Sequence, residues 1–296
     1  MELSDGSGVE QTGQGRPAPT QLDLLQGIAS AADQQMISPC APADQPSQES
    51  PAQKVLQQSH GMPATLLILD TETTGLDPDQ DHCLEVGAIL FDVASRRVLQ
   101  QQSFLLPVSR NDAEAINRIP AEITQRPQPW QQALTMFGTL IDACDVVVAH
   151  NAAFDKQWFG RGVLPVIEKP WLCTMEDIRW PEDRQLRPRP SVRDLALAYG
   201  IPVWAAHRAL TDCIYIADVF QRCDDLETLL KHGLEPRQLM RAHVSYSDRQ
   251  LAKQAGFRWN DPVPGSWSRR LSDREAADLP FRVSAVEEEE AALASA

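Results

Sequence analysis

Apolar and polar positions alternate in two different rhythms along residues 64–233, and the change of rhythm predicts the order of strands and helices. Apolar runs with strand-like spacing cover residues 66–69, 83–92, 97–106, 145–149 and 171–175, with a turn at residues 93–96. Apolar residues at helical spacing cover residues 130–143, 152–160, 191–199, 207–224 and 225–232, and short helical turns are expected at residues 111–124. Three strands first, then strands alternating with helices, predict an α/β domain at residues 63–233, with a mixed sheet that begins as an antiparallel meander.

The segments that flank this domain differ from it in composition. Residues 1–62 are rich in Gln, Pro, Ser, Ala and Gly, and they hold too little apolar surface to offset the entropy of ordering, so we predict that they are disordered. An amphipathic stretch at residues 21–32 fits either a docking helix for a partner or a nascent helix without a role. Residues 286–296 include four consecutive glutamates and are expected to form a solvated acidic tail.

Residues 234–285 predict a separate small α+β module, in the order strand, helix, strand, turn, strand, helix and short strand. Its apolar anchors are Phe257, Trp259, Trp267, Leu279 and Phe281. The module has nine lysine and arginine residues against six acidic ones, whereas the whole chain has a net charge of −14. Its positive balance favours two hypotheses, a tether for nucleic acid or a packing appendage of the larger domain.

The composition narrows the class of protein. Hydrophobic residues make up 43% of the 296 residues and charged residues 23%, as in globular proteins, and no apolar run approaches the roughly 20 residues of a membrane span. The acidic N-terminus is not a secretory signal, and six cysteines without a C-x-x-C pair suggest free thiols in the cytoplasm. The net charge of −14 argues against binding nucleic acid through bulk charge, although an enzyme with metal ions and a local groove stays compatible.

Two carboxylates at the end of the first predicted strand are the first candidates for chemistry. The stretch TLLILDTETTGLDP, residues 65–78, places Asp70 and Glu72 two positions apart, so both side chains point to the same face of the strand. Two like charges side by side are unfavourable unless a cation binds between them, and Mg²⁺ and Mn²⁺ prefer such oxygen ligands. The alternative is an exposed turn just past the strand, with both acids solvated.

Two later motifs add carboxylates near the start of predicted helices. AHNAAFD, residues 149–155, follows a buried strand, and Asn151 suits the N-cap of a helix that bears Asp155. In AHRALTD, residues 206–212, a helix that begins just after His207 would carry Asp212 one turn in and aim both side chains at one cleft. Each motif alone also fits a capped helix with an ordinary surface acid, and only their conjunction favours a metal site.

The order D-x-E-T-T-G, H-N-A-A-F-D and H-x-x-x-x-D resembles the three motifs of the DEDDh exonucleases of the DnaQ type, over roughly residues 64–233. That family includes the proofreading subunit of a bacterial replicative polymerase and the ribonuclease T and oligoribonuclease families. The resemblance implies a ribonuclease H-like fold, with a mixed five-stranded sheet flanked by helices. It also implies that Asp70, Glu72, Asp155 and Asp212 hold two Mg²⁺ or Mn²⁺ ions and that His207 is the general base.

The activity implied by the resemblance is a 3′→5′ exonuclease, which hydrolyses the terminal phosphodiester bond of single-stranded DNA or RNA 3′ ends and releases 5′-mononucleotides. A polymerase or repair partner, engaged through residues 1–62, is a further expectation. The rival class is a catalytically silent module that keeps the fold for binding nucleic acid or a partner. A degenerate binder usually lacks one or more of the five key residues, and here all five are filled.

The resemblance also matches weaker positions to contacts with the substrate. They follow the first strand or belong to the second motif, and they are Thr73, Thr74, Gly75, Leu76, Asn151 and Phe154. We expect Gly75 to permit a tight turn and Leu76 to pack on the terminal base, with turn former, core residue and cap as the alternatives. Glu85 lies in a motif-like stretch but also fits a strand-face carboxylate. Five arginines beside Trp180, within residues 179–193, predict either a single-strand groove or a solvated Pro-rich loop.

Overall fold

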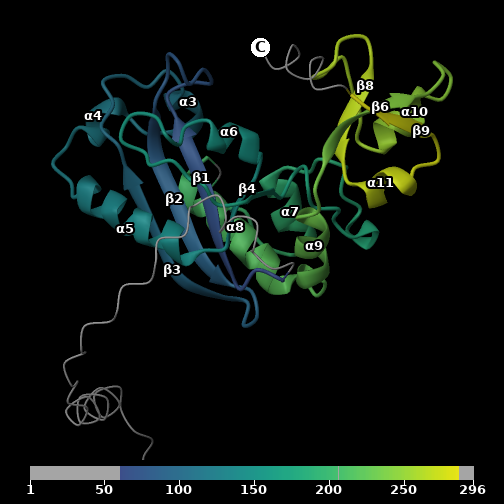
Figure 1. The fold of residues 1–296 in the computed structure, drawn as a ribbon. Helices are drawn as coiled ribbons and strands as arrows, with labels where there is room; N and C mark the ends of the chain where they lie inside the picture. The colour runs from purple at the N-terminus through teal and green to yellow at the C-terminus, as the bar shows by residue number, and fades with distance from the viewer. Residues whose placement is uncertain (1–60, 206, 287–296) are drawn as a thin grey trace, which may run out of the picture. The chain divides into compact units, whose positions relative to one another are not determined.

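A computed structural model describes residues 61–205 and 207–286 and contains two sheets, one of five strands and one of four (Figure 1). All but the last two residues of the segment predicted to be disordered, residues 1–62, lie outside the described residues, as do the helix predicted at residues 21–32 and most of the acidic tail. Within the described part of the chain, no helix combines the length and the apolar character that a membrane span requires.

The five-stranded sheet has the order β3-β2-β1-β4-β5. Its strands are β1 Thr65–Thr73, β2 Cys83–Asp92, β3 Arg97–Leu105, β4 Val146–Ala149 and β5 Trp171–Cys173. The first three strands pair antiparallel as a meander, whereas β4 pairs parallel with both β1 and β5. The predicted mixed sheet flanked by helices is therefore confirmed.

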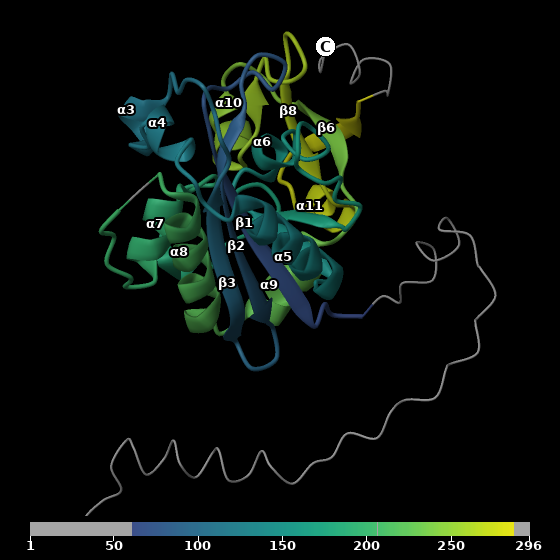
Figure 2. The same ribbon diagram turned by 90° about the vertical axis from the view of Figure 1, so that its left-hand side faces the viewer.

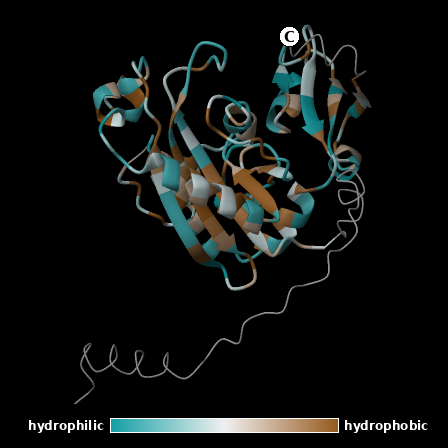
Figure 3. Ribbon diagram, turned by 60° about the vertical axis from the view of Figure 1, so that its left-hand side comes forward, coloured by the Kyte–Doolittle hydropathy of each residue, from teal (hydrophilic) through white to brown (hydrophobic). Residues whose placement is uncertain are grey.

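Side chains alternate along β1 and fill a core on each face of the sheet. Leu66 and Ile68 pack on one face with residues of α7 (Val192–Ala198), α8 (Ala209–Arg222) and α9 (Leu226–Gly233). Leu67 and Leu69 pack on the other face with residues of α5 (Trp130–Ala143). Figure 2 shows α5 and α8 on opposite sides of the sheet, and Figure 3 shows apolar colour along its inner strands. The three layers bury β1 from both sides, so the residues that follow Leu69 are held rigidly.

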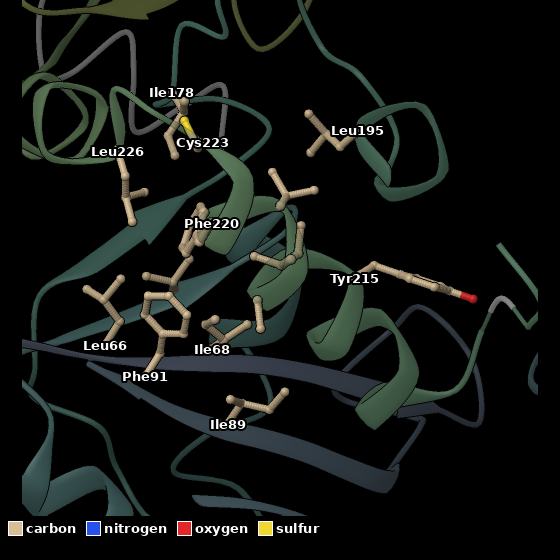
Figure 4. Packing of buried hydrophobic residues seen from close by; sticks show 14 of the residues in the cluster. Leu66, Ile68, Ile89, Phe91, Ile178, Leu195, Tyr215, Phe220, Cys223 and Leu226 are labelled. Atoms are coloured by element: carbon tan, nitrogen blue, oxygen red, sulfur yellow. The ribbon is translucent and has the colours of Figure 1, made fainter. Parts of the chain in front are cut away.

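The core on the α8 face contains a ring contact between strand and helix. Phe91 of β2 and Phe220 of α8 meet edge to face, with their ring centroids 6.0 Å apart (Figure 4). Such pairs stabilise by about 1 kcal/mol beyond the burial of their area. This contact lies toward the C-terminal end of α8 and fixes that end of the helix on the sheet.

The helices begin and end near their predicted limits, with one correction. Ser191 caps α7 as predicted, in a capping box with Asp194. The helix expected at residues 152–160 covers only Ala152–Lys156 (α6), because turns follow it before Gly160. Asn151 occupies the N-cap position of α6, as predicted, but it has a left-handed backbone, φ 68°, and its side chain makes no capping bond. The remaining short elements of this region are α3 Glu114–Asn117, α4 Ala121–Thr124 and η1 Glu182–Arg184.

Strand β1 continues four residues beyond the apolar run that predicts it. Asp70, Thr71 and Glu72 pair with residues 87–85 of β2, so both carboxylates lie within the sheet rather than in a turn after it. The prediction ended the strand at Leu69 because hydrophobic pattern was its only signal, and β2 supplies the hydrogen bonds that the pattern does not show.

The C-terminal module forms the four-stranded sheet, with the order β7-β8-β6-β9 and antiparallel pairs throughout. Its elements are β6 Gln238–His243, α10 Arg249–Gln254, β7 Arg258–Trp259, β8 Trp267–Leu271, α11 Asp273–Ala277 and β9 Arg282–Ala285. Phe257, Trp267, Leu279 and Phe281 belong to its core, as predicted, whereas Trp259 is 56% exposed and contacts Trp267 only at the surface.

A buried cluster of charges joins the module to the loop that follows β5. Arg179 Nε lies 2.8 Å from Glu275 Oε1, and Arg237 Nη2 lies 3.2 Å from the same oxygen. Arg237 also donates to the carbonyl oxygen of Asp177 at 2.9 Å. Burial opposes the ionised form of Glu275, but the neighbouring Arg179 and Arg237 outweigh it and hold its pKa below the usual range. Glu275 is therefore shared by both arginines, and Asp177 is a more distant second partner of Arg237, with Oδ1 3.9 Å from Nε.

We expect Glu275→Gln to lower the free energy of unfolding by about 3 kcal/mol, because it removes the closer of the two acids that pair with the buried Arg237. Chemical denaturation measures the loss. Since the pKa of Glu275 is lowered in the folded state, its contribution is present above its ordinary value of 4.5 and disappears as the pH falls further. Glu227→Gln is the control, because Glu227 is 46% exposed in its pair with Arg96, and it should cost less than about 1 kcal/mol. Equal losses for both variants at pH 7 would contradict this assignment.

Candidate functional site

Helix α8 approaches the sheet closely at Gly87, the residue that pairs with Asp70 across the β1–β2 ladder. A Cβ atom at Gly87 would lie 2.4 Å from the backbone carbonyl carbon of Ala209 and 2.4 Å from the backbone nitrogen of Leu210, so only glycine admits the helix here. The contact brings Asp212, in the first turn of α8, to the face of β1 that carries Asp70.

Glu85, which lies on β2 like Gly87, anchors the start of α8 to this strand. Its carboxylate is 2% exposed and accepts hydrogen bonds from Arg208 Nη2 at 2.8 Å, Arg208 Nε at 3.0 Å and the backbone N–H of Ala209 at 3.1 Å. Ser103 adds a fourth bond at 2.9 Å. A carboxylate at a helix N-terminus satisfies a free N–H and interacts favourably with the helix dipole. Glu85 is therefore a structural anchor for the helix that bears Asp212.

Asp155 reaches β1 from the opposite edge. Strand β4 pairs with β1 only as far as Leu69, so the N–H of Thr71 has no strand partner on that side. Asp155 Oδ1 accepts this N–H at 3.0 Å and the Thr71 hydroxyl at 2.7 Å. The fourth predicted acid is thus held beside the other three by the polar residue between Asp70 and Glu72.

His207 lies two residues before α8 with a left-handed backbone, φ 61°, and its side chain is exposed. The segment before it is fixed by Tyr215, whose hydroxyl accepts the N–H groups of Trp204 at 3.0 Å and Ala205 at 3.1 Å. The same hydroxyl donates to the carbonyl oxygen of Ala205 at 2.8 Å. Glu85, through Arg208, holds the segment on the other side, so His207 stands on a short loop fixed at both ends.

The four carboxylates share one property, a raised pKa, and burial is the largest cause for each. Burial, together with repulsion from Asp212, raises the pKa of Glu72 to about 8. Burial and repulsion from Asp155 and Asp212 raise the pKa of Asp70 well above its usual value. Burial raises the pKa of Asp155 to about 7 against its bonds to Thr71, and that of Asp212 to about 6 against the charge of His207.

This donor set fits a hard divalent cation. Asp70, Glu72 and Asp212 each offer an oxygen such that the three atoms lie within 4.8 Å of one another. Carboxylates that repel each other and resist ionisation in the absence of a cation are stabilised when one binds between them. Asp155 lines the same pocket as this trio, and its Oδ1 is engaged by Thr71.

All five predicted catalytic residues line one pocket of about 440 Å³, which we call the carboxylate pocket. Its wall also contains five of the six predicted substrate contacts, namely Thr73, Thr74, Gly75, Leu76 and Phe154. Leu76 is 80% exposed and stands at the rim with Ile116, which is 57% exposed, so an apolar edge borders the acids. The structure therefore brings together residues from β1, α6 and α8 that lie far apart in the sequence.

The structure places three of the weaker positions differently from one another. Asn151 lines a different hollow and not the carboxylate pocket. The Thr74 hydroxyl accepts the N–H of His82 at 3.0 Å, which closes the loop after β1. A Cβ at Gly75 would lie 2.2 Å from the Asp81 carboxylate, so any other residue would require that side chain to shift. The tight turn expected at Gly75 stays a prediction.

Sequence reasoning missed four polar residues of the carboxylate pocket, namely Thr71, Asp112, Asn117 and His150. Asn117, in the short helix α3, donates to the carbonyl oxygen of Thr73 at 3.1 Å and holds the end of β1. His150 Nδ1 lies 2.9 Å from the Thr174 hydroxyl, and burial lowers its pKa to about 4, so its ring is neutral. The first residue of HNAAFD could have signalled His150, whereas nothing in the local pattern around Asn117 points to the pocket.

The arginine-rich segment is mostly engaged within the protein. Arg179 and Arg189 pair with Glu275 and Glu176, Arg187 pairs with Asp194, and Arg184 stacks on the Tyr199 ring with 4.4 Å to its centroid. These contacts hold the loop against its neighbours. Four of the five arginines therefore hold the loop within the protein, and the single-strand groove predicted for this segment stays a prediction.

Two family models match the chain. A model described as an exonuclease matches residues 67–220, the span that contains all five carboxylate-pocket motif residues. A model described as a domain of unknown function matches residues 238–286, which correspond to the C-terminal module.

Several known proteins are similar to the first of these regions. A DNA polymerase III of the PolC type from Thermotoga maritima is 30% identical over 176 residues, 58% of this chain and 12% of the relative. The DNA polymerase III subunit epsilon of Treponema pallidum is 28% identical over 158 residues, 51% of this chain and 72% of the relative. The structure of exonuclease X in complex with 5′ overhanging duplex DNA is 27% identical, with a TM-score of 0.41, and covers 57% of this chain and 97% of that one. The chain thus spans only about an eighth of the length of the first of these relatives.

We expect divalent cations to stabilise the protein more at pH 8 than at pH 5.5. Because these acids have higher pKa values in the folded than in the unfolded chain, their protonated forms stabilise the fold fully at pH values below their unfolded pKa, near 4. This stabilisation is lost as the pH rises through the folded pKa values, about 6 to 8. Without a cation, the Tm should fall over that pH window, and 10 mM Mg²⁺ or Mn²⁺ should restore it. At a hundredfold excess over Kd, the bound cation adds about 2.7 kcal/mol to the free energy of unfolding.

Thermal unfolding with chelator and with each cation measures this effect. The variant Asp70→Asn/Glu72→Gln should lose the response to cation, since it removes two of the three clustered acids. Its fall with pH should be smaller than that of the wild type but still present, because burial also raises the pKa of Asp155 and Asp212. A cation-dependent rise in Tm that is the same in the variant would place the ions elsewhere.

Proposed function

Because the chain belongs to the exonuclease family, whose model matches residues 67–220, we propose that it is a metal-dependent 3′→5′ exonuclease acting on DNA or RNA strands. One observation carries the proposal: Asp70, Glu72, Asp155, Asp212 and His207 come from three separate segments and line one pocket. A module that only binds has no need for four mutually repelling acids with a histidine beside them, so the silent alternative is not favoured.

Asp70, Glu72 and Asp212 would hold the divalent cations, with Asp155 as the fourth acid. We propose two Mg²⁺ or Mn²⁺ ions. When bound, such a pair polarises a phosphodiester and stabilises charge on its attacking and leaving oxygens. Glu85 and Gly87 keep α8 against β2, so Asp212 meets the β1 acids without rearrangement.

His207 would act as the general base. Its side chain is exposed at the pocket mouth, where it can take a proton from an attacking water. The water oxygen then bonds to the terminal phosphorus while the bond from phosphorus to the 3′ oxygen of the preceding nucleotide breaks. That oxygen takes a proton from solvent, and the products are a 5′-mononucleotide and a strand with a new 3′-hydroxyl.

The remaining pocket residues would orient the last nucleotide. Leu76 and Ile116 offer apolar surface for a base at the rim, and Phe154 of the second motif lines the pocket beside Asp155. Thr73, Thr74 and Gly75 bring backbone groups to the sugar and phosphate. The T. pallidum relative is named as a polymerase subunit, which supports DNA as the first substrate to test and a polymerase or repair complex as the partner. The cytoplasmic location and the partner role of residues 1–62 stay predictions.

We expect Asp70→Ala to abolish hydrolysis and His207→Ala to slow it by about 10²- to 10⁴-fold, the usual contribution of a positioned base. A 5′-labelled 20-nucleotide strand, as DNA and as RNA, should give a ladder of products shortened from the 3′ end with Mg²⁺ and none with chelator. His82→Ala is the control, because His82 is exposed and does not line the carboxylate pocket. Products released from the 5′ end, or activity that survives Asp70→Ala, would reject the proposal.

We expect Glu85→Gln to lower kcat about tenfold with little change in KM, because Glu85 acts through α8 and not on the substrate. Far-UV circular dichroism checks that the variant is folded. Glu122→Gln, an exposed acid in α4, is the control and should leave both constants unchanged. An increase in KM without a fall in kcat would instead indicate that Glu85 influences substrate binding.

A further inference from the structure

A second hollow, of about 470 Å³, lies between the β4–α6 segment and the C-terminal module. Its lining is strongly basic, with the five cations Lys156, Arg189, Arg258, Arg269 and Arg270 against the two acids Glu176 and Asp177. On a chain with a net charge of −14, this is a local concentration of positive charge that requires an explanation. We call it the basic hollow.

Several buried N–H groups in the basic hollow have no hydrogen-bond partner among the described residues. They are Nε and Nη2 of Arg269, Nε of Arg189 and Nε1 of Trp171. Each buried donor without a partner costs about 1–3 kcal/mol. All are donors on residues that line the hollow, so the lining favours a ligand that offers negative charge and acceptor oxygens, as a phosphate does.

The cations of the basic hollow are only partly neutralised by the protein. Glu176 pairs with Arg189 at 2.5 Å, and Arg258 pairs with Asp261 at 2.8 Å. Within residues 61–205 and 207–286, no acid forms an ion pair with the other three cations, Lys156, Arg269 and Arg270. These three charges are therefore available to an anion.

Arg269 is held in place by the module rather than free to move. Its Nη1 donates to the carbonyl oxygen of Ala255, next to Gly256. Gly256 has φ +79°, and a Cβ there would lie 2.7 Å from Arg269 Nη1, so the glycine leaves room for the guanidinium. Burial and the nearby Arg179 lower the pKa of Arg269 to about 10, and the group still carries its charge at pH 7. The site is preorganised.

One short segment separates the basic hollow from the carboxylate pocket. His150, Phe154 and Asp155 face the pocket, whereas residues 151–153 and Lys156 face the hollow. A helix with its side chains is about 10 Å across, close to the rise of about three stacked nucleotides at 3.4 Å each. A strand whose end lies in the pocket can therefore reach the hollow within a few nucleotides.

We propose that the basic hollow binds the sugar–phosphate backbone of the same single strand whose 3′ end enters the carboxylate pocket, a few nucleotides upstream of that end. The inference rests on the proposed function for the identity of the strand. It assigns the module a role, since β7 and β8 supply Arg258, Arg269 and Arg270, and it gives Asn151 a place beside the backbone instead of the terminal nucleotide.

Binding of fluorescent 20-nucleotide and trinucleotide strands to the full chain, with chelator to prevent hydrolysis, tests the proposal. Lys156→Ala/Arg270→Ala removes two exposed cations of the hollow, so the fold should survive. We expect its Kd for the 20-nucleotide strand to rise roughly tenfold, and its salt dependence to fall by about 1.4 in log–log slope for two lost phosphate contacts. The trinucleotide is too short to span both sites, so its Kd should rise less than about twofold.

Arg97→Ala/Lys231→Ala is the matched control, since it removes the same charge from exposed positions outside both the hollow and the pocket. The binding measurement is made once with oligo(dT) and once with oligo(rU). A loss with both assigns the hollow to the shared phosphate backbone, and a loss with one assigns it to that polymer. The proposal is overturned if the hollow variant binds the 20-nucleotide strand as the control variant does, or if the trinucleotide is weakened equally.

The outcome is separable from that of the proposed function. If the wild type binds the long strand through the basic hollow but does not shorten it with Mg²⁺ or Mn²⁺, the exonuclease proposal fails and the hollow stands. If the wild type shortens strands while the hollow variant binds and cleaves them like the control, the hollow fails and the exonuclease proposal stands.

Discussion

The docking of α8 on β2 is the constraint from which the site follows. Gly87 removes the one side chain that would hold the helix away, and Glu85, two residues earlier on the same strand, binds the first turn of the helix and Arg208. The burial of Phe91 against Phe220 fixes the other end. Because α8 is held at both ends, Asp212 cannot move away from Asp70 and Glu72, even though the three charges repel one another.

The repulsion among these acids lowers the stability of the fold at the carboxylate pocket. The acids are buried or half-buried, and each has a raised pKa. A raised pKa means that ionising these acids at neutral pH destabilises the folded chain. A sequence optimised only for folding would place apolar or paired groups there. The sheet core on both faces of β1 is large enough to hold the strand in place in spite of them.

The module and the larger sheet share one loop, the segment that follows β5. Arg179 of that loop meets Glu275 of α11, and Arg189 of the same loop lines the basic hollow. The loop thus holds the module through Arg179 and contributes Arg189 to the basic hollow. Packing appendage and strand-binding surface are therefore not exclusive, because the buried ion cluster sets the position of the exposed cations.

The sequence alone determined the mixed sheet, the order of its elements and the four acids with their histidine, because apolar periodicity and closely spaced motifs are local signals. It could not place the end of β1, since the hydrogen bonds that extend it come from β2. Nor could it find Asn117, assign Glu85 or explain Gly87, whose partners lie across the fold. The tertiary structure alone decided these points, and it also divided residues 150–156 between two hollows, because which way a side chain faces depends on what packs beside it.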